Sequence, residues 1–306
     1  TPPSTTTADE HEAVAPNGLE RGIHLVEGVL SSGKAGGDAV FPSCVYSGTV
    51  RAVLTELRLP HEVHYSALMP ASRKAKWFVK QCEGRSGATT PAAAFDGEWL
   101  YDSSDILALL LKGEMKGGGA VPSCVSPSRV DAKEMERLNY EPEGGSVGDA
   151  LFGAYFGFLM AADDEGESKM AATMRGVIER LVALLDDGRA FIAGASPCRD
   201  DIVAAHALWM VYTVRHTEVL REVGVSEGVR ASTRAYFDRL LSRPSLQPLG
   251  VSLEDEDART EFLLAIKTKL QRPRIFPLTM GEGAERRPGE VGVHLCEGVM
   301  RDDGGN

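Results

Sequence analysis

Hydrophobic and polar residues in the first third of the chain alternate between strand-like and helix-like patterns. Residues 22–26 form a short run that predicts a strand, and residues 61–67 form a second such run after Pro60. Between these runs, apolar residues recur at the spacing i, i+3, i+4, i+7, which is typical of one helix face. These residues are Val50, Val53, Leu54 and Leu57. The order predicts a β-α-β unit.

A β-hairpin and another helix are predicted next. Residues 92–95 and 98–101 flank Asp96-Gly97, a dipeptide that strongly favours a hairpin turn. Asp102 or Ser103 can then cap the helix that follows. Strands and helices in this order indicate a compact α/β domain.

The pattern becomes entirely helical in the second half. After the α/β domain, which we place at residues 19–111, residues 112–147 are rich in Gly and Pro and predict a long connection with one helical turn near residues 132–138. Helical apolar spacing then fills residues 148–270, which predicts an all-helical C-terminal bundle. Its helical segments are residues 150–162, 177–185, 202–212, 231–241 and 262–270.

Both ends of the chain have a different composition. Residues 1–18 are rich in Pro and Thr, and residues 271–306 are rich in Gly, Pro and charge, so both are expected to be tails without a core. The first tail could be the remainder of a processed targeting segment or a cut fragment, and a protein assembly could order both tails. Residues 22–30 recur at 292–300 with six of nine positions identical, either by chance or as the start of a truncated tandem unit.

Composition and charge exclude several classes of protein. The 306 residues are 43% hydrophobic and 25% charged, as in a soluble globular protein. The net charge of −11 disfavours binding to nucleic acid or an anionic membrane. The longest aliphatic run, residues 106–111, is far shorter than the roughly 20 residues that span a bilayer. Five cysteines without Cys-x-x-Cys or zinc-site spacing disfavour a disulfide scaffold and a structural zinc site, so no metal is expected.

The motifs along the chain resemble one known superfamily. Residues 44–60 (CVYSGTVRAVLTELRLP) align without a gap on the Cys-Pro-Phe/Tyr-Cys/Ser-Gln-Arg-Val...Leu-Pro segment of the cytosolic glutathione transferases. Thr90-Pro91, residues 95–103 and a capping box at Cys198 and Asp201 fit the same template. From residue 19 to 270 the chain is most similar to the glutathione-dependent dehydroascorbate reductases, followed by the chloride intracellular channel proteins. The resemblance implies a thioredoxin-like N-terminal domain and a helical C-terminal domain.

Cys44 is the candidate nucleophile. It precedes the helix that begins near Val50, and the free N–H groups and positive dipole end of a helix stabilise a thiolate. We therefore expect its pKa to lie below the usual value of about 8.5 and Cys44 to be the most thiolate-like cysteine. The alternative is that Cys44 is a small buried hydrophobic residue. Ser47 stands where dithiol relatives have their second cysteine, so the chemistry would use one thiol.

Glutathione is the implied co-substrate. The resemblance implies that Pro91 is cis and that the Thr90 backbone pairs with the cysteinyl part of glutathione. It also implies that Asp102 and Ser103 hold the γ-glutamyl group and that Lys74 meets the glycyl carboxylate. The alternatives are an ordinary proline at a strand start, a simple helix cap and a solvated charged face.

The chain also departs from that family. Glu27 replaces a lysine near the active site, and Val45 and Gly48-Thr49 replace other motif residues. A carboxylate here would repel an anionic substrate and oppose thiolate formation at Cys44. The histidines indicate no other chemistry, because His61 and His64 are expected on opposite strand faces and His206 is expected to be packed.

Two functions remain open. In the first, Cys44 reduces a small oxidised substrate such as dehydroascorbate with glutathione, with an activity impaired by Glu27. In the second, the chain is a non-catalytic, glutathione transferase-like structural subunit of a larger assembly, for example a plastid photosynthetic complex. A soluble protein of a reducing compartment, the cytoplasm or a plastid, fits both.

Overall fold

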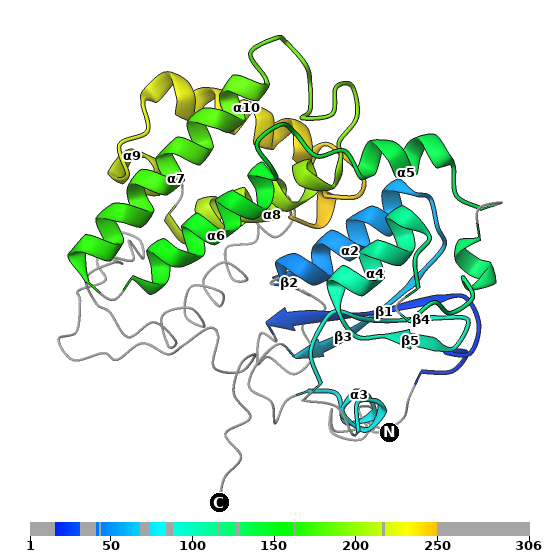
Figure 1. Ribbon diagram of the computed structural model, residues 1–306. Helices are drawn as coiled ribbons and strands as arrows, with labels where there is room; N and C mark the ends of the chain where they lie inside the picture. Colours follow the sequence, from blue (N-terminus) through cyan, green and yellow to red (C-terminus); the bar gives the residue numbers. More distant parts are fainter. Residues whose placement is uncertain are drawn as a thin grey trace, which may run out of the picture.

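The computed structural model describes residues 16–30, 41–42, 44–67, 74–83, 88–115, 117–126, 129–161, 163–215 and 218–249. They form a mixed β-sheet with helices on both faces, followed by a group of long helices that packs against the helices on one of these faces (Figure 1). This is the thioredoxin-like domain and helical C-terminal region that the sequence predicts. The apolar stripe at 262–270, most of both tails and the repeat copy at 292–300 lie outside the described residues, and the domain boundaries stay a prediction.

Strand β1 lies at the centre of the five-stranded sheet. It pairs in parallel with β3 and antiparallel with β4 and, at its C-terminal end, with β2. The strands are β1 (Ile23–Leu30), β2 (Phe41–Pro42), β3 (Glu62–Ala67), β4 (Ala92–Phe95) and β5 (Glu98–Leu100). The hairpin between β4 and β5 turns at Asp96-Gly97, as the sequence predicts, and both residues have positive φ, 49° and 88°. The short strand β2 was not predicted.

Helices α2 (Val45–Glu56) and α4 (Ser103–Lys112) cover one face of the sheet, and the short helix α3 (Lys76–Gln81) covers the other (Figure 1). The four residues of the predicted helix stripe, Val50, Val53, Leu54 and Leu57, are all buried in the larger core. Beneath α3 a separate small cluster contains Val26, Phe78 and Ala92. Because successive residues of β1 point to opposite faces, each face of the sheet has its own apolar core.

The connection after α4 packs against the sheet. It contains a 3₁₀ turn, η2 (Ser123–Val125), and helix α5 (Ala132–Leu138), which is the helical turn that the sequence predicts. The carboxylate of Asp96 accepts hydrogen bonds from Gly22 N (2.9 Å), Ser123 Oγ (2.7 Å) and Cys124 N (3.0 Å). These bonds hold the connection to the hairpin and lower the pKa of Asp96 to about 2.

The second half is helical, with α8 at its centre. Its helices are α6 (Val147–Met160), α7 (Asp164–Leu184), α8 (Arg199–Arg215), α9 (Glu218–Glu222) and α10 (Glu227–Leu241). Asp201 accepts from the backbone of Cys198 (2.8 Å) and Ile192 (2.9 Å) and from Tyr236 Oη (2.6 Å), so the predicted capping box is confirmed as a folding element. No helix in the described ranges is long and apolar enough to cross a membrane.

Among the described residues, contacts at both ends of α2 join the helical half to the sheet half. Gly48 of α2 packs so closely on α8 that a Cβ added there would lie 2.1 Å from His206 Nε2. At the other end of α2, Glu56 accepts from Arg243 Nη2 (3.0 Å), Ser245 Oγ (2.6 Å) and Arg137 Nη2 (3.5 Å). Helix α2 is therefore the element through which the two halves are held in place.

Candidate active site at the start of helix α2

Cys44 is the N-cap residue of α2. Its backbone is extended (φ −96°, ψ 109°), and its Sγ accepts a hydrogen bond from Ser47 N at 3.5 Å. Ser, Thr, Asp or Asn usually takes this position. The thiol thus lies at the positive end of the helix dipole, as the sequence predicts.

Burial changes the expected acidity of this thiol. Cys44 is only 8% exposed, and desolvation raises its pKa. The hydrogen bonds from Ser47 act in the opposite direction but are outweighed, and the nearby charge of Glu27 raises the pKa further. The expectation of a pKa below the ordinary value is therefore wrong for this structure, because a thiolate loses more solvation in the buried site than the helix end returns.

Thr90 and Pro91 lie beside the thiol. The Thr90-Pro91 peptide bond is cis, as expected, and Cys44 Sγ lies 3.9 Å from Thr90 O. The chain therefore brings together two segments that are 46 residues apart in the sequence. Thr90 Oγ1 is buried and has no hydrogen-bond partner among the residues that the structure describes.

Asp102 and Ser103 form the start of α4. Asp102 is the N-cap residue and accepts from Ser104 N at 2.8 Å and from the Ser104 hydroxyl. Ser103 is the first residue of the helix and lies in the wall of a cavity. The cap that the sequence predicts is confirmed, and its use as a ligand site stays a prediction.

Lys74 lies on the α3 side of the sheet. Its Nζ donates to Ala88 O at 2.6 Å, and partial burial lowers its pKa. Ala88 comes two residues before Thr90, so this bond holds the segment that leads to Thr90-Pro91. Arg73, a neighbour in the predicted basic cluster, is outside the described residues, whereas Lys76 and Lys80 are exposed.

A small cavity lies next to the start of α2. Its volume is about 170 Å³, and its walls come from α2, α4, α6 and α8. The lining residues are Val45, Tyr46, Thr49, Ser103, Ser104, Leu107, Asp149, Phe152, Arg199 and Val203. Arg199 and Asp149 form an ion pair at 3.0 Å on its rim. Because pockets for drug-sized ligands span about 300–1,000 Å³, this cavity suits only a small molecule.

Glu27 lies beneath α2 and is fully buried. Its Oε2 is 2.9 Å from Arg51 Nη1, although neither Glu27 oxygen has a partner with hydrogen-bond geometry in the described part of the chain. Burial raises the pKa of Glu27, and Arg51 opposes this shift. The expectation that Glu27 meets the anionic substrate is therefore wrong for this structure. Its effect on Cys44 is through the electrostatic field.

His206 is a packing residue, as the sequence predicts. It is 2% exposed, and its Nδ1 lies 2.8 Å from Ile202 O. Burial lowers its pKa to about 4, so the ring is neutral at physiological pH. Its Nε2 faces Gly48 and has no hydrogen-bond partner among the described residues.

Comparison with known proteins agrees with this arrangement. Residues 43–112 match the family "Glutathione S-transferase, N-terminal domain". Over 221 residues the chain is 28% identical to glutathione S-transferase DHAR2 of Arabidopsis thaliana, which covers 69% of this chain and 86% of that protein. The family match includes Cys44 and the segment of Thr90-Pro91.

One solved structure in particular supports the fold. The crystal structure of Chlamydomonas reinhardtii dehydroascorbate reductase superposes with a TM-score of 0.54 at 13% identity, covering 78% of this chain and 95% of that chain. Glutathione transferase Omega 3C of Trametes versicolor superposes with a TM-score of 0.49 at 15% identity, covering 79% and 91%. The chain thus resembles the glutathione transferase superfamily, and within it the dehydroascorbate reductases, in the sequence of its N-terminal domain and in its fold.

Proposed function

We propose that the protein is a glutathione-dependent thiol oxidoreductase of the dehydroascorbate reductase type, with Cys44 as its nucleophile. The observation that carries the proposal is the position of Cys44, which caps α2 with its Sγ 3.9 Å from the carbonyl oxygen before cis-Pro91. A thiol at a helix N-terminus is a common setting for redox cysteines. The matched relative, a glutathione S-transferase, supports glutathione as the co-substrate.

Glutathione would lie across the edge between α2, β4 and α4. In this arrangement the Thr90 backbone pairs with the cysteinyl unit, which brings the glutathione sulfur toward Cys44. The first turn of α4, with Asp102 and Ser103, receives the γ-glutamyl carboxylate, because free N–H groups at a helix start favour anions. Lys74 would receive the glycyl carboxylate after exchanging its bond to Ala88 O.

The reaction balances with one protein thiol. The Cys44 thiol and one water molecule reduce dehydroascorbate to ascorbate, and the sulfur is oxidised to a sulfenic acid. One glutathione then condenses with the sulfenic acid, releasing water and forming a mixed disulfide. A second glutathione attacks the glutathione sulfur of this disulfide, which regenerates the Cys44 thiol and yields oxidised glutathione. Ser47 cannot replace the second glutathione, because a hydroxyl does not form a disulfide.

The cavity beside Tyr46 and Ser103 is the proposed place for the oxidised substrate. Its volume of about 170 Å³ admits a small molecule, and Arg199 offers N–H donors to carbonyl oxygens. Phe152 and Leu107 give this space an apolar part of its wall.

A second function, a non-catalytic subunit of a larger assembly, is favoured by one observation. Cys44 is buried and its pKa is raised, which keeps the sulfur as the less reactive thiol at neutral pH. In this alternative the thiol serves as the cap of helix α2, and the fold provides a surface that contacts other subunits of the assembly.

Steady-state dehydroascorbate reduction tests the proposal. Ascorbate formation is followed with glutathione as reductant in the wild type, in Cys44→Ser and in Cys82→Ser, a control that changes a buried cysteine on the α3 side of the sheet. We expect Cys82→Ser to retain activity and Cys44→Ser to lose at least about 100-fold, because the nucleophile is removed.

Glutathione binding to Cys44→Ser, measured by calorimetry, separates the two functions. Binding without turnover supports the proposed role of Cys44. Wild-type-like turnover by Cys44→Ser contradicts it. If the wild type neither binds glutathione nor reduces dehydroascorbate, the result supports the structural-subunit function.

A further inference from the structure

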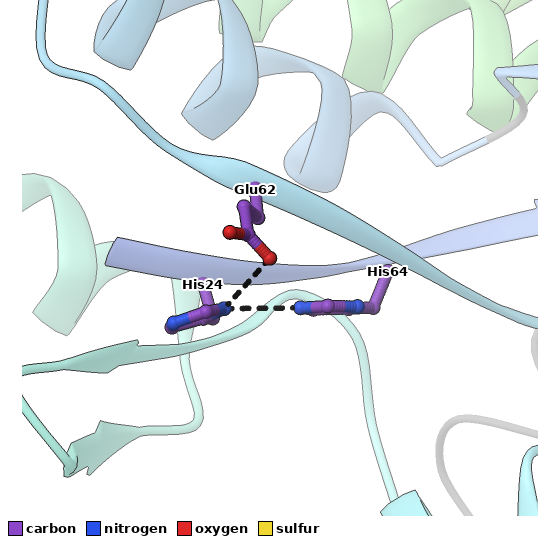
Figure 2. A group of neighbouring side chains, drawn as sticks. All are labelled: His24, Glu62 and His64. Atoms are coloured by element: carbon purple, nitrogen blue, oxygen red, sulfur yellow. Dashed lines mark hydrogen bonds and ion pairs between the residues drawn. The ribbon is translucent and has the colours of Figure 1, made fainter. Parts of the chain in front are cut away.

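Three polar side chains meet on the sheet face opposite α2. His24 of β1 and His64 of β3 approach each other, with His24 Nδ1 3.1 Å from His64 Nε2, and Glu62 Oε2 lies 3.6 Å from the same His24 nitrogen (Figure 2). The strand register explains the meeting, because His24 pairs with Glu62 and Val26 with His64. Glu62 and His64 are two residues apart on one strand and therefore share a face.

The fixed surroundings of His24 determine which nitrogen is free to bind. His24 is 3% exposed, and its Nε2 lies 2.8 Å from Arg21 O. A carbonyl only accepts, so Nε2 carries the proton and Nδ1 presents its lone pair to His64 and Glu62. Metal-ligating histidines usually donate their second N–H in this way, to a backbone carbonyl or a carboxylate.

The two rings meet edge to edge. Their planes differ by 17°, and their centroids are 5.4 Å apart, whereas the facing nitrogens are only 3.1 Å apart. Without a metal, one proton links the two nitrogens. His64 is half-buried beside Trp77 (ring centroids 6.0 Å apart). Its ring can therefore rotate until its lone pair and that of the fixed His24 ring point to one common position.

The separations of the ligand atoms suit a tetrahedral metal ion. Two ligands about 2.0–2.1 Å from Zn²⁺ lie roughly 3.3–3.4 Å from each other at the tetrahedral angle. The observed separations are 3.1 Å and 3.6 Å, on either side of this value. All three ligand atoms lie within 4.8 Å of one another. Two imidazoles and one carboxylate form a donor set that Zn²⁺ accepts, with a fourth position open to water.

We propose that His24, His64 and Glu62 form a zinc site that is separate from the Cys44 site. The ligands come from adjacent strands of the sheet, which hold them more rigidly than loops do. Binding replaces the proton between the two histidines with Zn²⁺. Glu62 is 69% exposed, so the ion can reach the site from solvent and Glu62 can close over it. No sequence motif marks the site, because His24 and His64 are 40 residues apart and only the pairing of β1 with β3 brings His24 to Glu62 and His64.

Calorimetric titration of the full chain with Zn²⁺ tests the proposal. The variants are His64→Gln, Glu62→Gln and the control His61→Gln, which changes a histidine next to Glu62 whose Nδ1 lies 2.8 Å from Leu59 O. We expect the wild type and His61→Gln to bind one equivalent with the same Kd. His64→Gln is expected to bind at least about 100-fold more weakly and Glu62→Gln about 10-fold more weakly, because each loses one ligand.

A second measurement guards against misfolding of the variants. The melting temperature of the wild type should rise with added Zn²⁺, because the ligand binds the folded state, and that of His64→Gln should not. Circular dichroism without zinc should show the same fold for all four proteins. The proposal is overturned if Zn²⁺ does not bind the wild type, or if folded His64→Gln binds it with the wild-type Kd.

Discussion

Arg51 of α2 lies 2.9 Å from Glu27 of β1, and the carboxylate of this pair is fully buried. The pair joins the central strand of the sheet to the helix that carries Cys44. It also explains why a lysine at position 27 does not suit this chain, since a buried ammonium beside Arg51 would place two positive charges together. Glu27→Lys is therefore expected to destabilise the fold, and Glu27→Gln is the better probe of the charge.

Glu27→Gln should lower the pKa of Cys44. The buried carboxylate is one of the causes that raise this pKa, and the variant removes its negative charge. In the wild type, the rate of Cys44 alkylation by iodoacetamide should still rise with pH above about 8.5, the ordinary thiol value. In Glu27→Gln the pH-rate curve should move to lower pH, so that alkylation at neutral pH is faster than in the wild type.

The site of alkylation is read by mass spectrometry, with the exposed Glu98→Gln as the control. Superimposable curves for the wild type and Glu27→Gln would show that Glu27 does not influence the thiol.

Gly48→Ala should destabilise the protein, although alanine favours a helix. The added Cβ meets His206 Nε2 at 2.1 Å, and repacking such a contact costs about 1–3 kcal/mol. Gly153→Ala on α6 is the matched control, because its Cβ meets nothing within 4 Å, and it should stabilise by up to about 1 kcal/mol. Urea unfolding gives both values.

A double-mutant cycle isolates the contact with His206. In the His206→Ala background, Gly48→Ala should cost nothing, because the ring has been removed. An equal cost in both backgrounds would mean that the strain lies elsewhere.

Glu56→Ala should loosen the junction of the two halves. The Glu56 side chain is 5% exposed and is bound by Arg137, Arg243 and Ser245. Removing the carboxylate that binds Arg243, and one of the two carboxylates that bind Arg137, should lower the free energy of unfolding by about 2–4 kcal/mol. Glu134→Ala removes a 44%-exposed partner of Arg137 and should cost less than about 1 kcal/mol. Equal effects of the two variants in chemical denaturation would argue against a junction role for Glu56.

Asp96→Asn should destabilise the protein in a pH-dependent way. Asparagine tolerates the positive φ of this turn but cannot accept all three hydrogen bonds, so a loss of about 1–2 kcal/mol is expected. The folded-state pKa of Asp96 is lowered to about 2, so its contribution is complete above about pH 4 and is lost as the pH falls toward 2.

The stability difference between Asp96→Asn and the wild type should therefore shrink between pH 4 and 2. Asp131→Asn, at the N-cap of α5, is the control and should be near neutral, since both residues cap well. A constant difference over this pH range would contradict the assigned role of the carboxylate.

Local pattern was sufficient to predict most of the fold. The helix stripe at Val50 and Leu54, the Asp96-Gly97 hairpin and the cap at Asp102 depend on neighbours in the sequence, and the structure has all three. Strand β2 and helix α3 were missed, because two and six residues carry too little periodicity to detect.

The site was less predictable, because its chemistry depends on burial and on distant partners. The position of Cys44 at a helix start could be read from the sequence, but its desolvation and its distance to Thr90 could not. The partner of Glu27 is Arg51, 24 positions away, and the sequence offers no signal for this pair. Long-range geometry therefore determines the acidity of the thiol.

The most direct test of the account is to trap the mixed disulfide. The full chain is incubated with dehydroascorbate, one equivalent of glutathione is added, and the intact mass and digest are measured by mass spectrometry. The account predicts a mass increase of one glutathione, located on Cys44, absent in Cys44→Ser and present in Cys82→Ser. Glutathione attached to another cysteine, or an unmodified Cys44 under these conditions, would contradict it.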